Sequence, residues 1–500
     1  MLRACGTLAA IVALAWAPAA AAEPLVLAAP DGSYVRLIDD PALPAPEPVP
    51  PGITTGAPAP AQARAAGPSV LGAIAALRRR RAIDADLAEQ YQDDWKRSVR
   101  IAKRLPRARA AELRAVLATT RDLAARNLLS ATRLPAVMLT VVRNRSWWAG
   151  GATVAPGRRV RFKDSQLIWQ YYPGQGLQIQ WLGTFGRANA LWSFTGKDDE
   201  LAQLLAEARA LAASRAGGIA YEYLFVFGGG RPPWVSGLAQ GTALTAFMRG
   251  SARLKEPSYA DDAKAALGIF RTAPPKGVRL ALPGGVHYLQ YSFARDQRIA
   301  NGFVQALNGL RDYAALGNSD EGWRLFRAGE RELRTELRRY DTGAWSLYEW
   351  RRGRPGAEST LDYHKLLAQF LGGLCERLTG DRERAGAKAA QATGGASPAD
   401  AATPAPAERS ALAGQTDPAP YCKAEARMRG YLTTKPVVTI TARSLRTGRR
   451  GTVRVRLSKI ASTTVRLRQG GRVLLARSAT LSRGCTRSRS GHAAARSGRR

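Results

Sequence analysis

The chain has 500 residues, of which 45% are apolar and 23% are charged. This supply of apolar residues can build a packed core and excludes a wholly disordered chain. Lys and Arg number 75 against 39 Asp and Glu, which gives a formal net charge of +36. Such an excess favours an anionic partner, although a general bias towards Arg would give the same composition. Three His and four Cys are too few for a multi-ligand metal site, and we expect no metal and no cofactor.

Residues 1–22 have the pattern of an export signal. One Arg is followed by an apolar run and then by Ala20-Ala21-Ala22 before Glu23. The run of roughly 14 apolar residues suits a secretory signal peptide cleaved after Ala22 and is too short to span a membrane. We therefore expect a secreted or cell-envelope-associated protein with no stable membrane insertion after cleavage.

The next three segments differ in composition and in the periodicity of their apolar residues. Residues 23–68 are rich in Pro and Ala and indicate a linker. Residues 69–158 show apolar positions at helical spacing and predict an N-terminal helical segment. Residues 159–196 alternate with a period of two and predict a β region, in which 167–172 and 177–181 form a hairpin.

The remaining segments predict a helical domain and a basic β module. Residues 197–384 return to helices of 12–20 residues with loops between them, which predicts a mainly α fold of the incomplete α/α toroid type. A second linker covers 385–420, a small antiparallel β module covers 421–485, and 486–500 form a disordered basic tail. Residues 441–500 contain seventeen Lys and Arg and no acidic residue.

Three cysteines remain after export, and an oxidising compartment permits disulfides. Cys375 ends a helical pattern and Cys422 follows the second linker. Their pairing would attach the C-terminal part to the helical domain, and it is the candidate disulfide. Connectivity with Cys485 stays open because a single sequence does not fix it.

Six motif blocks follow one another in the helical region. They are 233–241 (PWVSGLAQG), 284–291 (GGVHYLQY), 301–303 (NGF), 310–313 (LRDY), 339–345 (RYDTGAW) and 362–364 (DYH). Their order and spacing resemble the C-terminal domain of the D-glucuronyl C5-epimerases, which act on heparosan-type polysaccharides. The resemblance covers residues 231–380, and it extends more weakly to 171–192. It implies a carbohydrate epimerase, an isomerase, of the uronyl type.

The implied reaction removes a proton alpha to a carboxylate and returns one from the opposite face. It needs a base, an acid, and donors or cations where negative charge develops. In the family the proton carriers are a Glu and tyrosines, and the tyrosines fall on Tyr291, Tyr340 and Tyr363. The Glu falls on Gln290, whose amide cannot take up a proton. We expect His364 to replace it, since a histidine titrates near neutral pH.

His287 is the second choice for the base. Trp234 and Trp345 are candidate sugar-stacking platforms, although both could be core residues, as could His364. Further substrate-binding candidates come from the same blocks and their flanks: Arg231, Gln240, Gln290, Arg298, Asn301 and Asp341. An arginine from positions 231, 295, 298 or 339 suits a uronate carboxylate, and we expect at least one to meet the three tyrosines in one cleft.

The function expected from these residues is C5 inversion of a uronate in an acidic polysaccharide. Gln290 keeps open a catalytically impaired protein that only binds acidic polysaccharide. A uronate lyase is a third candidate, because it shares the first proton abstraction. No nucleic-acid recognition motif is present, and the sequence leaves the oligomeric state undetermined.

Overall fold

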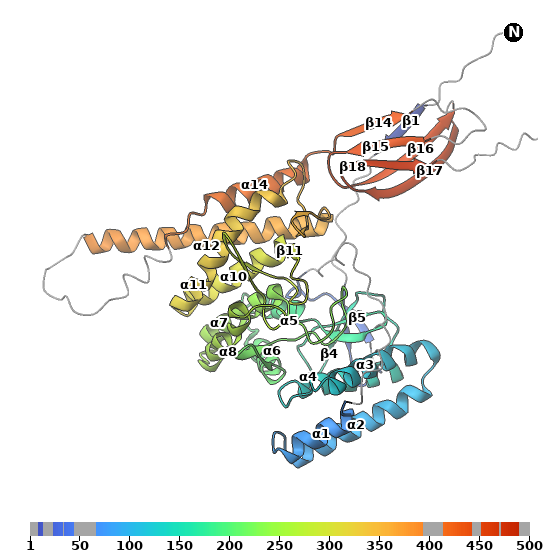
Figure 1. The fold of residues 1–500 in the computed structure, drawn as a ribbon, viewed down its shortest axis with the longest axis vertical. Coiled ribbons are helices and arrows are strands. Elements are labelled where there is room, and N and C mark those ends of the chain that lie inside the picture. The colour runs from blue at the N-terminus through green and yellow to red at the C-terminus, as the bar shows by residue number, and fades with distance from the viewer. Residues whose placement is uncertain are drawn as a thin grey trace, which may run out of the picture.

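The computed structural model describes residues 9–13, 24–33, 35–44, 67–393, 414–442, 452–469 and 472–489. Most of the predicted signal peptide, most of both linkers and residues 490–500 lie outside these ranges. The described part is mainly helical with several small separate sheets (Figure 1), which confirms the mainly α class. None of its helices is long and apolar enough to cross a membrane.

The N-terminal helical segment contains four helices. They are α1 (Val70–Arg79), α2 (Ala85–Arg104), α3 (Arg107–Ala125) and α4 (Leu134–Gly150). The first two begin where a side chain caps the helix, because Ser69 Oγ accepts from the Gly72 amide and Asp84 from the Leu87 amide. The Ser69 cap falls at the predicted start of this segment.

A five-stranded sheet follows, in the order β3-β2-β4-β5-β6. Its strands are β2 (Leu25–Ala28), β3 (Val35–Ile38), β4 (Arg159–Phe162), β5 (Trp169–Tyr172) and β6 (Gly176–Ile179). The predicted hairpin forms between β5 and β6, with Trp169 opposite Ile179.

The first two strands depart from the linker predicted for 23–68. Leu25, Val26 and Ala28 are almost fully buried in the sheet, and β2 runs parallel to β4. Burial of this short apolar run outweighs the proline-rich composition around it. The linker prediction is wrong for 25–28 and 35–38.

The sequence predicts a β region for 159–196, and this is wrong for 181–191, which form a helix. This helix and those of the predicted helical region, 197–384, follow in chain order. They are α5 (Trp181–Leu191), α6 (Asp198–Ala210), α7 (Gly237–Leu254), α8 (Ser258–Ala266), α9 (Gly268–Arg271), α10 (Ala300–Leu316), α11 (Asp320–Glu336), the 3₁₀ turn η1 (Leu337–Tyr340) and α12 (Leu361–Thr393). Helices α7 and α10 touch through their backbones, since a Cβ on Gly309 would lie 2.1 Å from the Gly241 carbonyl oxygen. Glycine at this crossing allows the close approach.

Short strands lie between these helices, and β10 belongs to the motif block 284–291. They are β7 (Ala213–Arg215), β8 (Gly218–Ala220), β9 (Arg279–Leu282), β10 (Gly285–Tyr288), β11 (Gln297–Ile299), β12 (Glu349–Arg351) and β13 (Arg354–Pro355). Strand β10 pairs with β9, and β11 pairs with β12. Strand β11 leads directly into α10, and this junction positions the candidate site.

Helix α14 (Ala419–Thr433) lies along α12 (Figure 1) and is joined to it by the disulfide Cys375–Cys422. The candidate disulfide is therefore confirmed. Residues 421–433 were predicted to belong to the β module and are instead helical. The second predicted linker, 385–420, is wrong for 385–393, which extend α12, and for 419–420, which begin α14. Tyr421, Ala424 and Met428 are buried at helical spacing, so packing decides the conformation of this segment.

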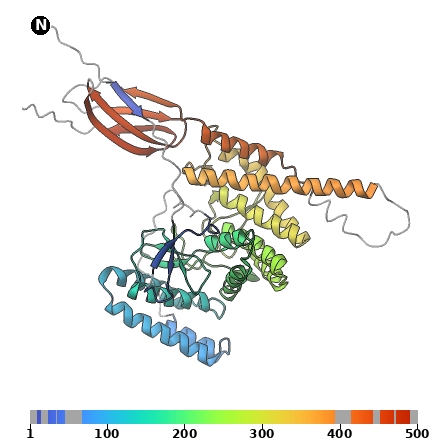
Figure 2. The same cartoon turned by 180° about the vertical axis from the view of Figure 1, so that it is seen from behind.

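The basic strands begin at Val438 and form two sheets (Figure 2). The sheet orders are β14-β15-β18 and β1-β16-β17, with β1 (Ala9–Ala13), β14 (Val438–Ala442), β15 (Thr452–Leu457), β16 (Ala461–Gln469), β17 (Arg472–Leu481) and β18 (Gly484–Arg489). Strand β1 belongs to the predicted export signal and pairs antiparallel with β16. Strand β18 takes in residues 486–489, which were predicted to be tail.

Candidate active site

The junction of β11 and α10 is the centre of the candidate site. Helix α10 begins after Ile299 with no side-chain cap, and its first amide, that of Ala300, donates to the Tyr348 carbonyl oxygen at 3.2 Å. An uncapped helix start carries partial positive charge. The motif blocks approach this junction from β10, η1 and the start of α12.

Glu336, the last residue of α11, is fully buried and binds three donors. Its Oε2 accepts from His287 Nδ1 at 2.9 Å and from the Tyr340 hydroxyl at 3.1 Å, and its Oε1 accepts from Arg298 at 2.5 Å. Burial acts to raise the pKa of Glu336, but the interactions with His287 and Arg298 outweigh it and lower the pKa to about 2. The carboxylate is therefore ionised at neutral pH.

His287 is oriented by this carboxylate. An ionised carboxylate can only accept, so Nδ1 of His287 carries the proton. The ring is fully buried and packs on Phe303 with centroids 4.1 Å apart. Its Nε2 has no hydrogen-bond partner in the part of the chain that the structure describes. A neutral His287 thus presents one unbonded nitrogen lone pair, which is the feature a general base requires.

Glu332 lies one turn before Glu336 on α11. Burial raises the pKa of Glu332, and the negative charge of Glu336 raises it further. The helix therefore carries two carboxyl groups whose pKa values are pushed in opposite directions, a pattern found at acid–base sites. Glu332 holds its proton to a higher pH than an ordinary Glu does.

Tyr340 is fully buried, and its hydroxyl donates to Glu336. Burial raises the pKa of Tyr340 well above its usual value, and the charge of Glu336 adds to the effect. A phenol with so high a pKa retains its proton at neutral pH. Tyr340 therefore orients the carboxylate in this geometry, while the sequence predicted it as a proton carrier.

Gln290 and Tyr291 lie next to the start of α10. The Gln290 amide donates to the Tyr291 hydroxyl oxygen at 3.0 Å. Gly302 leaves room for Gln290, since a Cβ on Gly302 would lie 2.4 Å from Gln290 Oε1. The Tyr291 ring belongs to an aromatic cluster that also contains Phe227, Trp234 and Phe293.

Tyr363 and Asn301 reach the same junction. Tyr363 packs on Tyr348 with ring centroids 4.5 Å apart, and Tyr348 accepts the first amide of α10 through its carbonyl oxygen. Asn301 is 2% exposed. Its Nδ2 has no hydrogen-bond partner among the described residues, so a buried donor is left for a ligand to satisfy.

Trp234 connects this cluster to the β hairpin. Its ring stacks on Tyr223 at 4.3 Å, and the Tyr223 hydroxyl donates to Gln180 at the end of β6. Trp234 is 3% exposed, so a sugar could stack on it only after the cluster opens. Gln240 binds the backbone N–H and C=O of Tyr221, which makes it an anchor for that loop.

His364, the predicted base, is held by both nitrogens. Its Nδ1 accepts from the Ser346 amide at 3.2 Å, and its Nε2 donates to the Met428 carbonyl oxygen at 2.8 Å. Burial, aided by the charge of Lys459, lowers the pKa of His364 to about 4. The geometry assigns His364 to the packing of α12 against α14 and does not favour its role as the base.

Three further predicted residues contact other parts of the molecule. Trp345 stacks on His364 at 3.6 Å, with the Lys459 ammonium 5.1 Å from its ring centre. Asp341 binds the Tyr431 hydroxyl and pairs with Arg427 of α14. Arg231 pairs with Asp122 of α3. These contacts join segments of the fold, and substrate binding by the three residues stays a prediction.

The structure therefore gathers seven of the predicted residues around the β11–α10 junction: His287, Gln290, Tyr291, Arg298, Asn301, Tyr340 and Tyr363. It adds Glu332 and Glu336, which sequence reasoning missed. One signal was available, since positions 332, 336 and 340 repeat at the four-residue spacing of a helix face. His287 and Arg298, which bind Glu336 and lower its pKa, lie on β10 and β11, far from Glu336 in the sequence.

Comparisons with known proteins agree with the motif blocks. Residues 216–384 match the family described as D-glucuronyl C5-epimerase C-terminus. A D-glucuronyl C5-epimerase of Caenorhabditis elegans is 30% identical over 156 residues, which are 28% of this chain and 25% of that protein. The match thus spans a quarter of the relative's length. The suspected relationship to the epimerase family is confirmed for this region.

A comparison with solved structures adds little. An endo-beta-1,4-glucanase, CMCax from Acetobacter xylinum, aligns over 50% of this chain and 88% of its own, with a TM-score of 0.29 and 14% identity. A similarity this weak carries no argument about the fold or the substrate.

Proposed function

We propose that this protein is an exported uronyl C5-epimerase-like enzyme acting on a uronic-acid-containing polysaccharide. The family match over residues 216–384 supports the reaction class. One observation carries the proposal further: the buried His287–Glu336 pair lies among the motif residues, and His287 Nε2 has no partner among the described residues. This pair supplies the base that Gln290 cannot.

The proposed first step is proton abstraction. His287 Nε2 takes the proton from C5, and the electron pair moves into the adjacent carboxyl group of the uronate. Glu336 stabilises the imidazolium that forms through its Oε2, while Arg298 pairs with Oε1 of Glu336. A positioned base of this kind accelerates a reaction by roughly 10²–10⁴-fold.

The negative charge on the substrate carboxyl group then needs donors. The uncapped start of α10 and the unsatisfied Asn301 Nδ2 supply them at the junction. Tyr291 is the proposed acid for the opposite face. Its oxygen already accepts from Gln290, so its own proton is directed away from that amide. Exchange with water afterwards returns the proton to Tyr291 and removes the one on His287.

Burial sets a further requirement on this mechanism. His287 and Glu336 are both fully buried, so a polysaccharide reaches Nε2 only when the surrounding cluster opens. In the same proposal, the helices α7, α10, α11 and α12 belong to an incomplete α/α toroid, with the junction at one end of its helices.

The test follows C5–H of heparosan-type and other polyuronates by NMR in deuterated water. The proposal expects deuterium at C5 and the appearance of the inverted uronate. Full retention of hydrogen at C5 in every polymer would refute the enzymatic function. A product that absorbs in the ultraviolet would instead indicate elimination and a uronate lyase.

A non-catalytic polysaccharide-binding protein is the second candidate, and Gln290 is the observation that favours it. It predicts salt-sensitive binding of polyuronates with no deuterium at C5. Under this function, Gln290→Glu would restore the family's carboxyl group beside Tyr291 and start the exchange. Exchange by the unaltered protein decides between the two candidates.

A further inference from the structure

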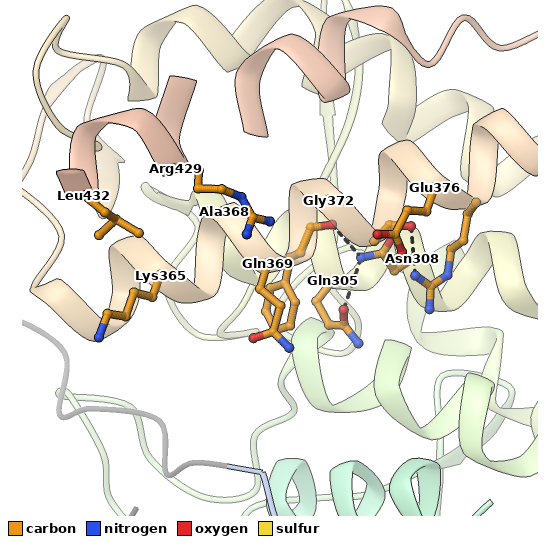
Figure 3. A pocket seen from close by; sticks show the side chains of 12 residues that line it. Gln305, Asn308, Lys365, Ala368, Gln369, Gly372, Glu376, Arg429 and Leu432 are labelled. Carbon is orange, nitrogen blue, oxygen red and sulfur yellow. Dashed lines mark hydrogen bonds between the residues drawn. The ribbon is translucent and has the colours of Figure 1, made fainter. Parts of the chain in front are cut away.

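A hollow of about 590 Å³ lies between α10, α12 and α14 (Figure 3). Gln305 and Asn308 of α10 line one side, and Arg429 and Leu432 of α14 line the other. Helix α14 is held over α12 by the disulfide Cys375–Cys422. Helix α14 lies beyond residues 216–384, which match the epimerase family, so part of this wall lies outside the matched region.

Two glycines of α12 leave the hollow open. Gly372 and Gly373 both line it, and each costs about 1 kcal/mol relative to Ala in a helix interior. A Cβ on Gly372 would lie 3.3 Å from Glu425 of α14, and one on Gly373 would lie 2.8 Å from the guanidinium of Arg377. Glycine here allows α14 to approach and keeps side chains out of the space.

The lining has the chemistry of a saccharide site. Asn308 is 2% exposed and donates to the Phe370 carbonyl oxygen and to Gln305, yet its Oδ1 has no partner among the described residues. Gln369 adds a second amide, and the ring of Phe370 adds an apolar surface. Amides with an aromatic ring suit a hydroxylated ring compound, which would supply the donor that Asn308 lacks.

The charges indicate an acidic saccharide. Arg377 is neutralised by Asp312, and Arg429 by Glu425. Lys365 has no ion pair or hydrogen bond among the residues that the structure describes. It lies at the end of the hollow opposite Glu376 (Figure 3). Because the Lys365 ammonium lies at the end away from the Glu376 carboxylate, a ligand with many hydroxyls could place a carboxylate beside Lys365.

Helix α10 runs from the candidate active site to the hollow. Asn301, Gln305 and Asn308 follow one another at spacings of four and three, so they form one stripe on the helix. At 1.5 Å per residue, Asn308 lies about 10 Å along the axis from Asn301. Asn301 and Asn308 are both buried, and each has one polar atom with no partner in the described part.

We propose that this hollow is a binding subsite for a uronate-containing segment of the same polysaccharide chain whose neighbouring uronate occupies the β11–α10 junction. This inference rests on the proposed function for the identity of the polymer. The subsite makes the protein select a polymer over a disaccharide.

The test measures equilibrium binding of a heparosan-derived disaccharide and hexasaccharide. Lys365→Gln removes the free ammonium and is expected to weaken hexasaccharide binding by about fivefold, with a smaller effect on the disaccharide. Lys423→Gln is the matched control, because Lys423 lies exposed on α14 and outside the hollow. A hexasaccharide whose uronates are reduced to neutral sugars should bind wild type and Lys365→Gln equally.

Gln369→Leu provides a second variant at an exposed position and is also expected to weaken hexasaccharide binding. Thermal midpoints near that of wild type establish that the variants fold. Equal hexasaccharide affinity in wild type and both variants overturns the subsite, as does absence of hexasaccharide binding by wild type. If the variants bind the hexasaccharide more weakly than wild type does, and wild type shows no C5 exchange, the subsite is upheld and only the enzymatic function is rejected.

Discussion

His287 and His364, which both lie in motif blocks, illustrate how the surroundings of a residue decide its role. His364 has both nitrogens bonded within the fold, whereas His287 has one nitrogen bonded to Glu336 and the other without a partner among the described residues. The sequence favours His364 over His287 as the base, because His364 lies next to Tyr363 in the chain. The contact of His287 with Glu336 joins residues 49 positions apart.

Replacement of His364 is expected to affect stability and leave the chemistry intact. His364→Gln loses at least one of two buried hydrogen bonds, which costs about 1–3 kcal/mol. Denaturant unfolding should show this loss, while C5 exchange per folded molecule stays near the wild-type rate. Abolished exchange at unchanged stability would show that His364 acts in the chemistry.

The pH dependence of stability should report the same residue. The pKa of His364 is lowered from 6.5 to about 4 by burial, so the unfolded chain binds its proton more readily than the folded one. Stability from this group is present above pH 6.5 and is lost as the pH falls towards 4, by about 3 kcal/mol in total. Between pH 7 and 4, the free energy of unfolding should fall less steeply with pH in His364→Gln than in wild type. An equal pH dependence in the two proteins contradicts the assignment.

Tyr340 offers a third test at this scale. Tyr340→Phe removes one of the donors to Glu336 while the ring still fills its site. If Tyr340 orients Glu336, C5 exchange should fall by about tenfold, far less than loss of a base would cost. NMR exchange assays at matched concentration measure this. A complete loss of exchange would restore Tyr340 to the role of proton carrier.

At the scale of elements, helix α14 depends on its covalent attachment. The disulfide Cys375–Cys422 closes a segment with a separation of 47 residues, and a loop of this length contributes about 4 kcal/mol in the chain-entropy estimate. The double variant Cys375→Ser and Cys422→Ser should lose a similar amount in denaturant unfolding. Reductant should destabilise wild type and leave the double variant unchanged, and equal effects on both would argue against the disulfide.

Gly302 tests the start of α10. Gly302→Ala places a methyl group 2.4 Å from Gln290 Oε1, so Gln290 must move and its bond to Tyr291 is lost. C5 exchange by Gly302→Ala should therefore fall. In the control Gly386→Ala nothing lies within 4 Å of the added Cβ, so exchange should not change and the free energy of unfolding should rise by up to about 1 kcal/mol from helix propensity. Unchanged exchange in Gly302→Ala would show that the Gln290–Tyr291 contact has no role.

The sequence predicts those elements whose signal is local. Helix α10 lies in the predicted helical region 197–384, since its apolar positions repeat at helical spacing. Strand β2 escaped prediction because its partner β4 lies more than 130 residues away, and its own four residues stand amid prolines. Glu336 escaped for a similar reason, since its three donors come from three separate segments.

At the scale of the whole molecule, positive charge gathers in the C-terminal part of the sequence. Residues 441–500 contain seventeen Lys and Arg and no acidic residue. Because Arg456 and Arg472 are exposed, the double variant Arg456→Gln and Arg472→Gln should weaken binding of long polyuronates and reduce its salt dependence. Unaltered salt dependence would exclude the module from polymer binding.

The central claim is that His287, oriented by Glu336, replaces the carboxylate base that Gln290 lacks. The most direct measurement compares deuterium incorporation at C5 of a heparosan-type polymer by wild type and by His287→Gln, with thermal midpoints recorded for both. We predict incorporation by wild type and a fall of at least about 100-fold in the variant. Equal rates in the two proteins, at equal fractions folded, would contradict the account.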